Sequence, residues 1–400
     1  MDIEMNLKKL VLASSILFFN SATFAQDGGL IDIGGFDLIP NVDITHAFDD
    51  NITRVGTGEI DSWKRILSPE AILRNNFGTN TLQFGYKLER GDFFSSSQDN
   101  YTDHFLSALL DYEFNSRHRA TTNFQYADGH DDRGTSFSTG SSNTLATPDR
   151  YTQLDGGILY SYGALTAGSR IDLNFDYSDL DYDGIEDSFL ARDRKNLTVG
   201  GNFYYQIAPA TELVVDYSRN DVTYDFTAVG NETLDSTNSS LLVGVKWAST
   251  AATSGFAKFG YQEKDFDSAE REKFDGFDWA IGISWQPIER STVEFSTQNN
   301  TNETNGEGNF IKQKSYNASW SHVWLDRVSS RMSVSLLSDV YEQSVTLRED
   351  DLTQLNMSIN YQLKRWLSLE AAYLYDERDS NVATIDYDRN SLSLGVNITL

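Results

Sequence analysis

The sequence ends with RNSLSLGVNITL, residues 389–400, which alternates apolar with polar or small side chains up to its last residue. Because successive side chains of an extended strand point to opposite faces, one face of this strand is wholly apolar: Leu392, Leu394, Val396, Ile398 and Leu400. Soluble proteins rarely leave such a strand at the edge of a sheet. In a closed membrane barrel the last strand pairs with the first, and its apolar face meets lipid. We therefore expect residues 389–400 to close a β-barrel; the alternative is an ordinary sheet strand that ends the chain by chance.

The same stretch resembles the C-terminal signal by which bacterial outer-membrane barrels are recognised for insertion. This signal consists of a polar residue, a glycine and two apolar residues, in that order. The matching positions are Ser393, Gly395, Ile398 and Leu400. Leu400 stands where an aromatic residue is more usual. The resemblance implies the bacterial cell outer membrane as the location, with its lipid and the barrel-insertion machinery as partners.

The N-terminus has the features of a secretory signal peptide. Lys8 and Lys9 precede an apolar run over residues 10–19, and the small residues Thr23 and Ala25 suit a cut after Ala25. No later segment offers about 18 consecutive apolar residues, so any insertion into a membrane must come from strands. We therefore divide the chain into a signal peptide at 1–25, a periplasmic N-terminal segment at 26–37 and a transmembrane barrel at 38–400.

The composition suits a barrel with a wet interior. The chain has 24 Phe, 20 Tyr and 7 Trp but only 39% hydrophobic residues, as expected when only alternate strand positions are apolar. It has no cysteine, which excludes disulfides and thiolate metal sites. The net charge of -27 argues against nucleic acid as a partner, because phosphate binding needs basic residues. Most acidic residues are expected to solvate long loops.

Aromatic residues recur at two levels with a repeat of about 40 residues. One level closes successive strands just before short turns, and we predict that it forms a periplasmic belt: Phe114, Tyr162, Tyr205, Trp247, Trp285, Trp324 and Tyr361. The other lies near the far ends of the intervening strands, and we predict that it forms an extracellular belt: Tyr86, Tyr126, Tyr177, Tyr217, Tyr261 and Tyr375. Two belts at the membrane interfaces are typical of barrels, whereas core aromatics of a soluble sandwich would have no reason to recur at both strand ends.

Connections of unequal length alternate along the chain. Short turns such as 115–118 and 326–329 belong on the periplasmic side, and long polar loops such as 127–150 belong outside. The pattern predicts an all-β fold, an antiparallel up-and-down transmembrane barrel of about 18 strands. Pro69 weakens the prediction of its second strand, and the Asn- and Thr-rich residues 299–309 are predicted to be disordered.

Charged residues on the strand phase opposite the aromatics are candidates to line the lumen and set its selectivity: Asp111, Asp155, Asp172, Asp176, Asp216, Lys246, Glu294, Arg331 and Glu370. Such residues can also serve as cross-lumen ion pairs that brace the wall, and the sequence leaves both roles open.

No catalytic residue, cofactor or metal site is predicted. The 5 histidines lack flanking residues that would assign them a role, and neither a G-x-S-x-G nor an H-E-x-x-H pattern occurs. Catalytic partners from distant segments could still meet in space, so catalysis stays open. The acidic stretch DYDGIED at 181–187 offers oxygen ligands but lacks the spacing of an EF-hand, and a solvated loop is the expected reading.

The chain resembles the EpsL and VpsM-like outer-membrane β-barrel porins, which are encoded with exopolysaccharide biosynthesis genes. The resemblance covers most of residues 30–400 and rests on PNVDITHAFDDNITR at 40–54, on the Tyr-ended hairpins and on SLSLGVNITL at 391–400. It implies export of a secreted polysaccharide across the outer membrane, together with periplasmic and inner-membrane export partners. The family offers no catalytic residues to carry over.

Three functions are therefore considered. The leading expectation is a channel that exports, or assists secretion of, an exopolysaccharide through a polar lumen. The alternative is a general or substrate-specific diffusion porin for small solutes. The third function, an outer-membrane hydrolase or adhesin, is the least favoured of the three.

Overall fold

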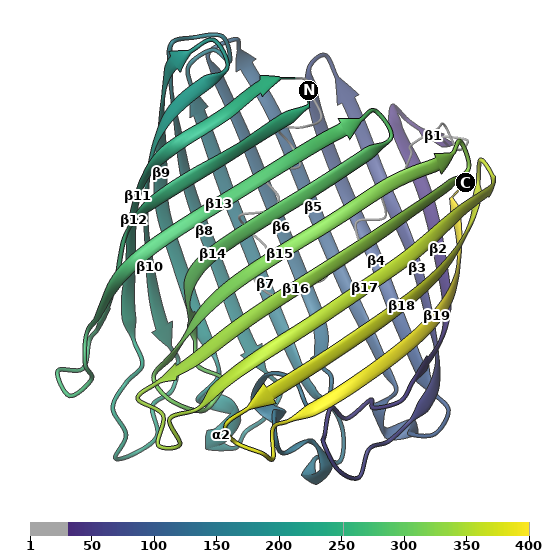
Figure 1. Ribbon diagram of the computed structural model, residues 1–400, viewed down its shortest axis with the longest axis vertical. Helices are drawn as coiled ribbons and strands as arrows, with labels where there is room; N and C mark the ends of the chain where they lie inside the picture. Colours follow the sequence, from purple (N-terminus) through teal and green to yellow (C-terminus); the bar gives the residue numbers. More distant parts are fainter. Residues whose placement is uncertain (1–30, 251, 400) are drawn as a thin grey trace.

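The computed structural model describes residues 31–250 and 252–399, most of which lie in antiparallel strands (Figure 1). The predicted signal peptide, the first residues of the predicted N-terminal segment and Leu400 lie outside the described residues. None of the described helices is long and apolar enough to cross a membrane.

The strands form one closed barrel. Its wall consists of the 18 strands β2 to β19, and β19 pairs with β2, so that Leu392 lies opposite Phe48 and Ile398 opposite Val42. The predicted closure of the barrel by the last strand is thus confirmed. In chain order the strands are β2 (Phe36–Asp49), β3 (Ser62–Phe77), β4 (Asn80–Phe93), β5 (Tyr101–Asn115), β6 (His118–Asp131), β7 (Asp149–Tyr162), β8 (Ser169–Tyr182), β9 (Arg194–Ala208), β10 (Thr211–Tyr224), β11 (Ser236–Thr250), β12 (Thr253–Phe266), β13 (Phe274–Ile288), β14 (Ser291–Glu303), β15 (Phe310–Leu325), β16 (Val328–Glu342), β17 (Glu349–Lys364), β18 (Leu367–Ser380) and β19 (Tyr387–Thr399).

The two ends of the barrel differ. At the short-turn end, which is uppermost in Figure 1, connections are as short as Asp326 and Arg327 between β15 and β16. A further short strand, β1 (Ile31–Ile33), pairs there with the start of β2. The long-loop end carries the remaining connections and the single-turn helix α2 (Asp187–Leu190).

Alternation along each strand sorts the side chains into an apolar outer face and a polar inner face. In β13 the outward side chains of Phe277 and Trp285 are 56% and 49% exposed, whereas Asp278 on the other phase is 6% exposed. Strand pairing preserves this order, because Phe277 lies opposite Tyr261 and Asp278 opposite Gly260. An outer face of large exposed apolar side chains is what lipid contact requires.

The strands extend further toward the long-loop end than the sequence pattern predicts. The loop expected over 127–150 shortens to residues 132–148, because β6 continues to Asp131 and β7 begins at Asp149. Polar residues such as Asp128 still occupy the ladder, opposite Thr152. Backbone hydrogen bonds do not depend on side-chain polarity. Strand ends beyond the apolar belt therefore stay paired with their neighbours although apolar and polar side chains no longer alternate there.

Two segments that the sequence marks as doubtful are strands. β3 pairs with β4 up to Leu67 and again from Glu70, so the ladder is interrupted beside Pro69, which has no N–H to donate. The prediction of disorder over residues 299–309 is wrong for its first half. Asn299–Glu303 belong to β14 and pair with β15, where Asn299 lies opposite Lys314.

Candidate functional site: the inner wall and mouth of the barrel

The inner wall of the barrel carries all nine charged residues predicted to line the lumen. The strand register places them on the face opposite the exposed apolar side chains; for example, Asp172 and Asp216 both lie opposite Asn202 from the two sides of β9. They are distributed from β5 to β18 around the circumference and do not form one ring. Several, including Asp111, Asp155 and Glu370, are only half-buried, so water reaches this wall.

Some of these residues are ion-paired on the wall. Lys258 Nζ of β12 lies 2.5 Å from Asp216 Oδ2, and Arg331 Nη2 lies 3.7 Å from Glu294 Oε2. Arg170 Nε lies 3.5 Å from Asp172 Oδ1. These pairs lie along the wall, within one strand or between strands two apart, and do not cross the lumen as the sequence analysis considered. Lys258 and Arg170 are partners that sequence reasoning missed.

The aromatic residues of both predicted belts lie on the outer face. One level ends the strands at the short-turn end, where Trp285 and Trp324 are 49% and 53% exposed. The other level lies mid-strand instead of near the strand ends, because β8 continues past Tyr177 to Tyr182 and β10 past Tyr217 to Tyr224. The outer wall beyond this second level is therefore polar.

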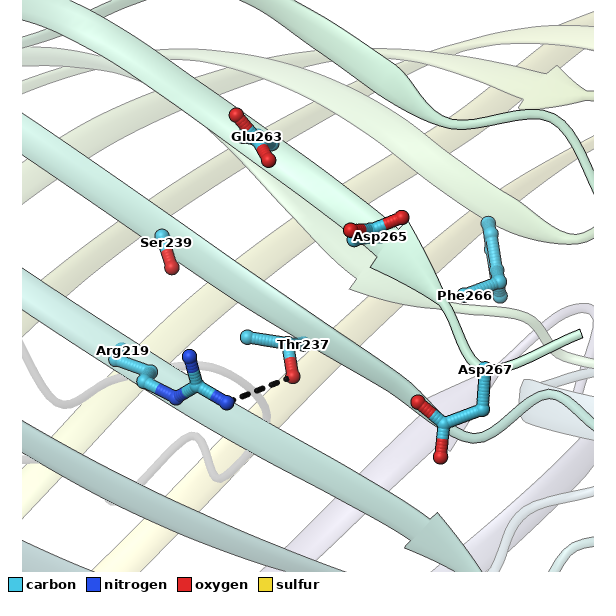
Figure 2. Close-up of a pocket in the computed structure, with 7 residues that line it drawn as sticks. All are labelled: Arg219, Thr237, Ser239, Glu263, Asp265, Phe266 and Asp267. Atoms are coloured by element: carbon cyan, nitrogen blue, oxygen red, sulfur yellow. Dashed lines mark hydrogen bonds between the residues drawn. The ribbon is translucent and has the colours of Figure 1, made fainter. Parts of the chain in front are cut away.

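Figure 2 shows part of this polar outer wall, over β10, β11 and β12. A hollow of about 220 Å³ is lined there by Arg219, Thr237, Ser239, Glu263, Asp265, Phe266 and Asp267. Arg219 Nη2 donates to Thr237 Oγ1 over 3.3 Å and lies 2.8 Å from Asp221 Oδ1. Charged side chains at this height suit contact with polar headgroups and not with the hydrocarbon core.

The connection between β6 and β7, residues 132–148, is here called the mouth loop. Two ion pairs anchor it to neighbouring connections. Arg133 is 3% exposed, and its Nε and Nη2 each lie 2.6 Å from one oxygen of Asp99, a bidentate contact with the connection between β4 and β5. Arg54, between β2 and β3, donates from Nη2 to Asp132 Oδ2 over 3.0 Å.

Two glycines let the mouth loop pack closely on its neighbours. Gly134 has a φ of +86° and Gly140 a φ of +75°, a backbone region that favours glycine. A β-carbon at Gly134 would collide with the carbonyl oxygen of Thr53, and one at Gly140 would lie 3.0 Å from Ile385 Cγ1, between β18 and β19. The mouth loop therefore contacts connections from several strands, as a segment folded over the opening would.

The mouth loop also reaches the opposite side of the barrel. The Phe137 ring packs edge-on against Tyr182 with centroids 5.6 Å apart, and the Arg192 guanidinium lies 4.6 Å from the Phe137 centroid. A β-carbon on Gly306 would lie 3.4 Å from Phe137 Cδ1. Gly306 lies between β14 and β15, eight strands away from β6 and β7 in a wall of 18, so the two segments meet across the opening.

The segment that meets it, residues 299–314, is here called the hairpin tip. It leans inward, because β13 pairs with β14 only as far as Gln298 while β14 continues to Glu303. Glu303 then accepts hydrogen bonds from Lys264 Nζ over 2.6 Å and from Tyr224 over 3.0 Å, although Tyr224 lies in β10. Lys264 is fully buried. The mouth loop and the hairpin tip together narrow the long-loop mouth.

These contacts stabilise the ionised forms of two carboxyl groups at the mouth, those of Asp132 and Glu307. Burial alone would raise the pKa of the Asp132 carboxyl, but Arg54 and a hydrogen bond from His130 hold it well below its ordinary value. Burial likewise opposes ionisation of Glu307, beside the hairpin tip's Gly306, yet Ser344, Thr346 and Arg348 lower its pKa. Both carboxylates are therefore fixed anions that hold loops together.

The arrangement of His130 and of the acidic side chains gives little support to catalysis or to metal binding. His130 has Asp103 at 2.8 Å from Nδ1 and Asp132 at 3.3 Å from Nε2, so both ring nitrogens face carboxylates and neither faces a nucleophile. Among the described residues, Asp179, Asp181 and Asp225 have carboxylate oxygens within 4.8 Å of one another. These side chains lie at the outer surface, and Lys195 already pairs with Asp225 at 2.6 Å.

Sequence reasoning missed Arg133, Phe137, Lys264 and Glu303, which shape the mouth. A signal existed for the first two, since an arginine and a phenylalanine stand within an otherwise polar, Gly- and Ser-rich loop. None existed for Lys264 and Glu303, because their contact joins strands that are 39 residues apart in sequence and are not neighbours in the wall.

Solved structures with a similar fold include the outer membrane protein OpdK of Pseudomonas aeruginosa. Pseudomonas aeruginosa OpdK with vanillate has a TM-score of 0.50 at 11% identity, covering 91% of this chain and 99% of that one. OccK2 (OpdF) of the same organism has a TM-score of 0.51 at 10% identity, covering 91% and 98%. The FrpB iron transporter of Neisseria meningitidis has a TM-score of 0.49 at 10% identity, covering 85% of this chain but 62% of that one. At these identities the likeness concerns the fold alone.

A search of curated proteins finds no match. The family model described as Putative beta-barrel porin 2 matches residues 25–400, nearly the whole chain, and the protein therefore belongs to this family of outer-membrane β-barrel porins.

Proposed function

We propose that this outer-membrane porin is a diffusion channel for small solutes. The observation that carries the proposal is the inner wall, whose polar and charged side chains, such as Asp111, Asp155 and Glu370, are only half-buried within a closed barrel of 18 strands. A barrel of this size normally encloses an aqueous channel. Diffusion through such a channel needs no cofactor and no moving part.

The narrowed mouth favours small solutes over a polymer chain. The mouth loop and the hairpin tip meet across the opening at Phe137 and Gly306, and buried ion pairs at Asp99 and Glu303 hold them there. A polysaccharide would need both segments to move aside. The expectation of exopolysaccharide export, with its periplasmic and inner-membrane partners, rests on the family resemblance alone, and we place it second.

We further propose that the short-turn end faces the periplasm and that the mouth faces the outside. Short periplasmic turns and long outer loops are the rule for bacterial outer-membrane barrels. The outer-face tyrosines and tryptophans then form the two interface belts, and the charged wall of Figure 2 stands at headgroup height.

The deciding experiment is conductance of the purified, folded protein in planar lipid bilayers. We expect stepwise conductance in KCl, and uptake of small neutral sugars into proteoliposomes. Heat-denatured protein at the same concentration is the control. A folded barrel that conducts nothing would overturn the proposal. Loss of cell-surface polymer in a deletion strain, with normal solute uptake, would favour export instead.

A further inference from the structure

We infer that the channel passes cations, including small solutes that carry amino groups, in preference to anions. The inference rests on the proposed diffusion function and assigns the preference to three inner-wall carboxylates, Asp111 of β5, Asp155 of β7 and Asp176 of β8, here called the acidic track.

The positive charges of the inner wall are largely neutralised. Eight of the basic side chains there and at the mouth lie in ion pairs with carboxylates: Lys64 with Asp49, Arg133 with Asp99, Arg170 with Asp172, Lys258 with Asp216, Lys264 with Glu303, Arg331 with Glu294, Arg348 with Asp350 and Arg389 with Asp49. Three others on the inner face, Arg74, Arg119 and Arg194, donate hydrogen bonds to neutral oxygen atoms. A paired cation exerts little field beyond its partner.

The carboxylates of the acidic track, in contrast, accept hydrogen bonds from neutral side chains. Asp111 Oδ1 accepts from Thr121 Oγ1 over 2.7 Å. Asp155 accepts from Gln153 Nε2 over 3.0 and 3.1 Å, and Asp176 Oδ2 accepts from Asn174 Nδ2 over 2.9 Å. None of the three carboxylates has a basic partner among the ion pairs of the described residues. Hydroxyl and amide donors hold these carboxylates in place and leave their negative charge uncompensated.

The acidic track lies within four successive strands, β5 to β8, with β6 between Asp111 and the other two carboxylates. Asp111 lies opposite Thr121 of β6, and Asp176 lies opposite Gly157 of β7, which is two residues from Asp155 on the same face. A β-carbon on Gly157 would lie 2.5 Å from Asp176 Oδ1 and 2.7 Å from the side-chain oxygen of Asn123. The missing side chain at Gly157 therefore lets Asp176 lean across β7 toward β6, where Asp111 is bonded.

Asp172, two positions beyond Asn174 on the inner face of β8, does not belong to the acidic track. It is 3% exposed, and Arg170 Nε lies 3.5 Å from its Oδ1, so its charge is compensated by the guanidinium.

Charges of one sign within a Debye length, about 10 Å at 0.1 M salt, act together on a passing ion. Three fixed carboxylates on one wall of a narrowed channel therefore raise the local concentration of cations and repel anions. The opposite wall, over β14 to β17, offers the neutral side chains of Ser319, Ser333, Asn317 and Asn356 and the mutually paired charges of Glu294 and Arg331.

The test is the reversal potential in planar bilayers under a KCl gradient. We expect potassium to permeate at least about threefold better than chloride at 0.1 M, and less selectively at 1 M because salt screens the track. The variant D111N/D155N/D176N keeps the side-chain volumes and should lower the ratio toward one while still conducting.

The control is D221N/E263Q/D265N, which removes three carboxylates of the outer face, nearer the long-loop end, and should leave the ratio unchanged. Heat-modifiable mobility on gels checks that each variant folds. Conductance without cation preference in the natural protein, or an unchanged ratio in D111N/D155N/D176N, would overturn the inference and leave the diffusion function standing. Absence of conductance would overturn the proposed function itself.

Discussion

Arg389 of the last strand donates from Nη2 to Oδ2 of Asp49 in the first barrel strand over 2.9 Å, and both side chains are buried. Nε of the same guanidinium lies 3.1 Å from each Asp49 oxygen, and Lys64 Nζ lies 3.1 Å from Oδ2. This cluster joins β19 to β2 and β3 at the long-loop end of the seam. The ladder between β19 and β2 begins just below it, at Ser391 and Asp49.

We expect R389Q to destabilise the barrel by roughly 3–5 kcal/mol, because it leaves buried carboxylates of Asp49 and Asp376 short of a cation. The measurement is the unfolding midpoint in guanidinium chloride, followed by tryptophan fluorescence in detergent micelles. R65Q is the control, since Arg65 pairs with Asp92 on the exposed outer face and should cost less than about 1 kcal/mol. Equal midpoints for the two variants would contradict the role of the seam cluster.

The Phe137 side chain should hold the mouth loop against the hairpin tip. We expect F137A to weaken this docking by about 1–3 kcal/mol, because it removes the ring contacts to Tyr182, Arg192 and Gly306. Single-channel conductance should rise, and current noise should increase as the loop opens and closes. F94A, which changes a 62% exposed phenylalanine of another connection, should conduct as the natural protein does. A conductance that does not differ between the two variants would argue against a loop-narrowed mouth.

Docking of the mouth loop should depend on pH through Asp132. A carboxyl whose pKa is lowered in the folded protein stabilises the fold above its unfolded pKa of about 4, and this contribution is lost as the pH falls through the folded value. We therefore expect constant conductance from pH 8 to pH 5 and an increase only below about pH 4. D132N removes the charge at every pH and should conduct at the higher level throughout. An increase in the natural protein near pH 6 would show that another group controls the loop.

The hairpin tip should depend on the buried pair of Lys264 and Glu303. K264M leaves Glu303 buried without its cation and should release the tip at a cost of roughly 3–5 kcal/mol. Limited proteolysis within residues 304–309 reports the release. The double variant K264M/E303L replaces the pair by apolar side chains and should recover most of the protection. Equal cleavage of the single and double variants would show that the apolar contacts of Phe310, and not the ion pair, hold the tip.

The alternation of side chains allowed much of the wall to be predicted. A period of two fixes which face each residue takes once the strand is known, so residues as different as Trp285 and Asp176 were assigned to the correct faces without any knowledge of their neighbours. The same rule identified residues 389–400 as a strand that needs a partner at the start of the chain. The ends of the strands were not predictable, because above the aromatic level both faces are polar and the alternation disappears.

What only the tertiary structure decided is how partners meet across the barrel. The stagger of the strands determines that Asp216 reaches Lys258, that Phe137 meets Gly306 and that Glu303 reaches Tyr224, and these contacts join residues 42 to 169 positions apart. Sequence by itself determined the closed wall and the polar inner face, since both follow from local backbone geometry and burial. The narrowing of the mouth and the charge left free on the acidic track depend on long-range pairing, which a one-dimensional pattern does not contain.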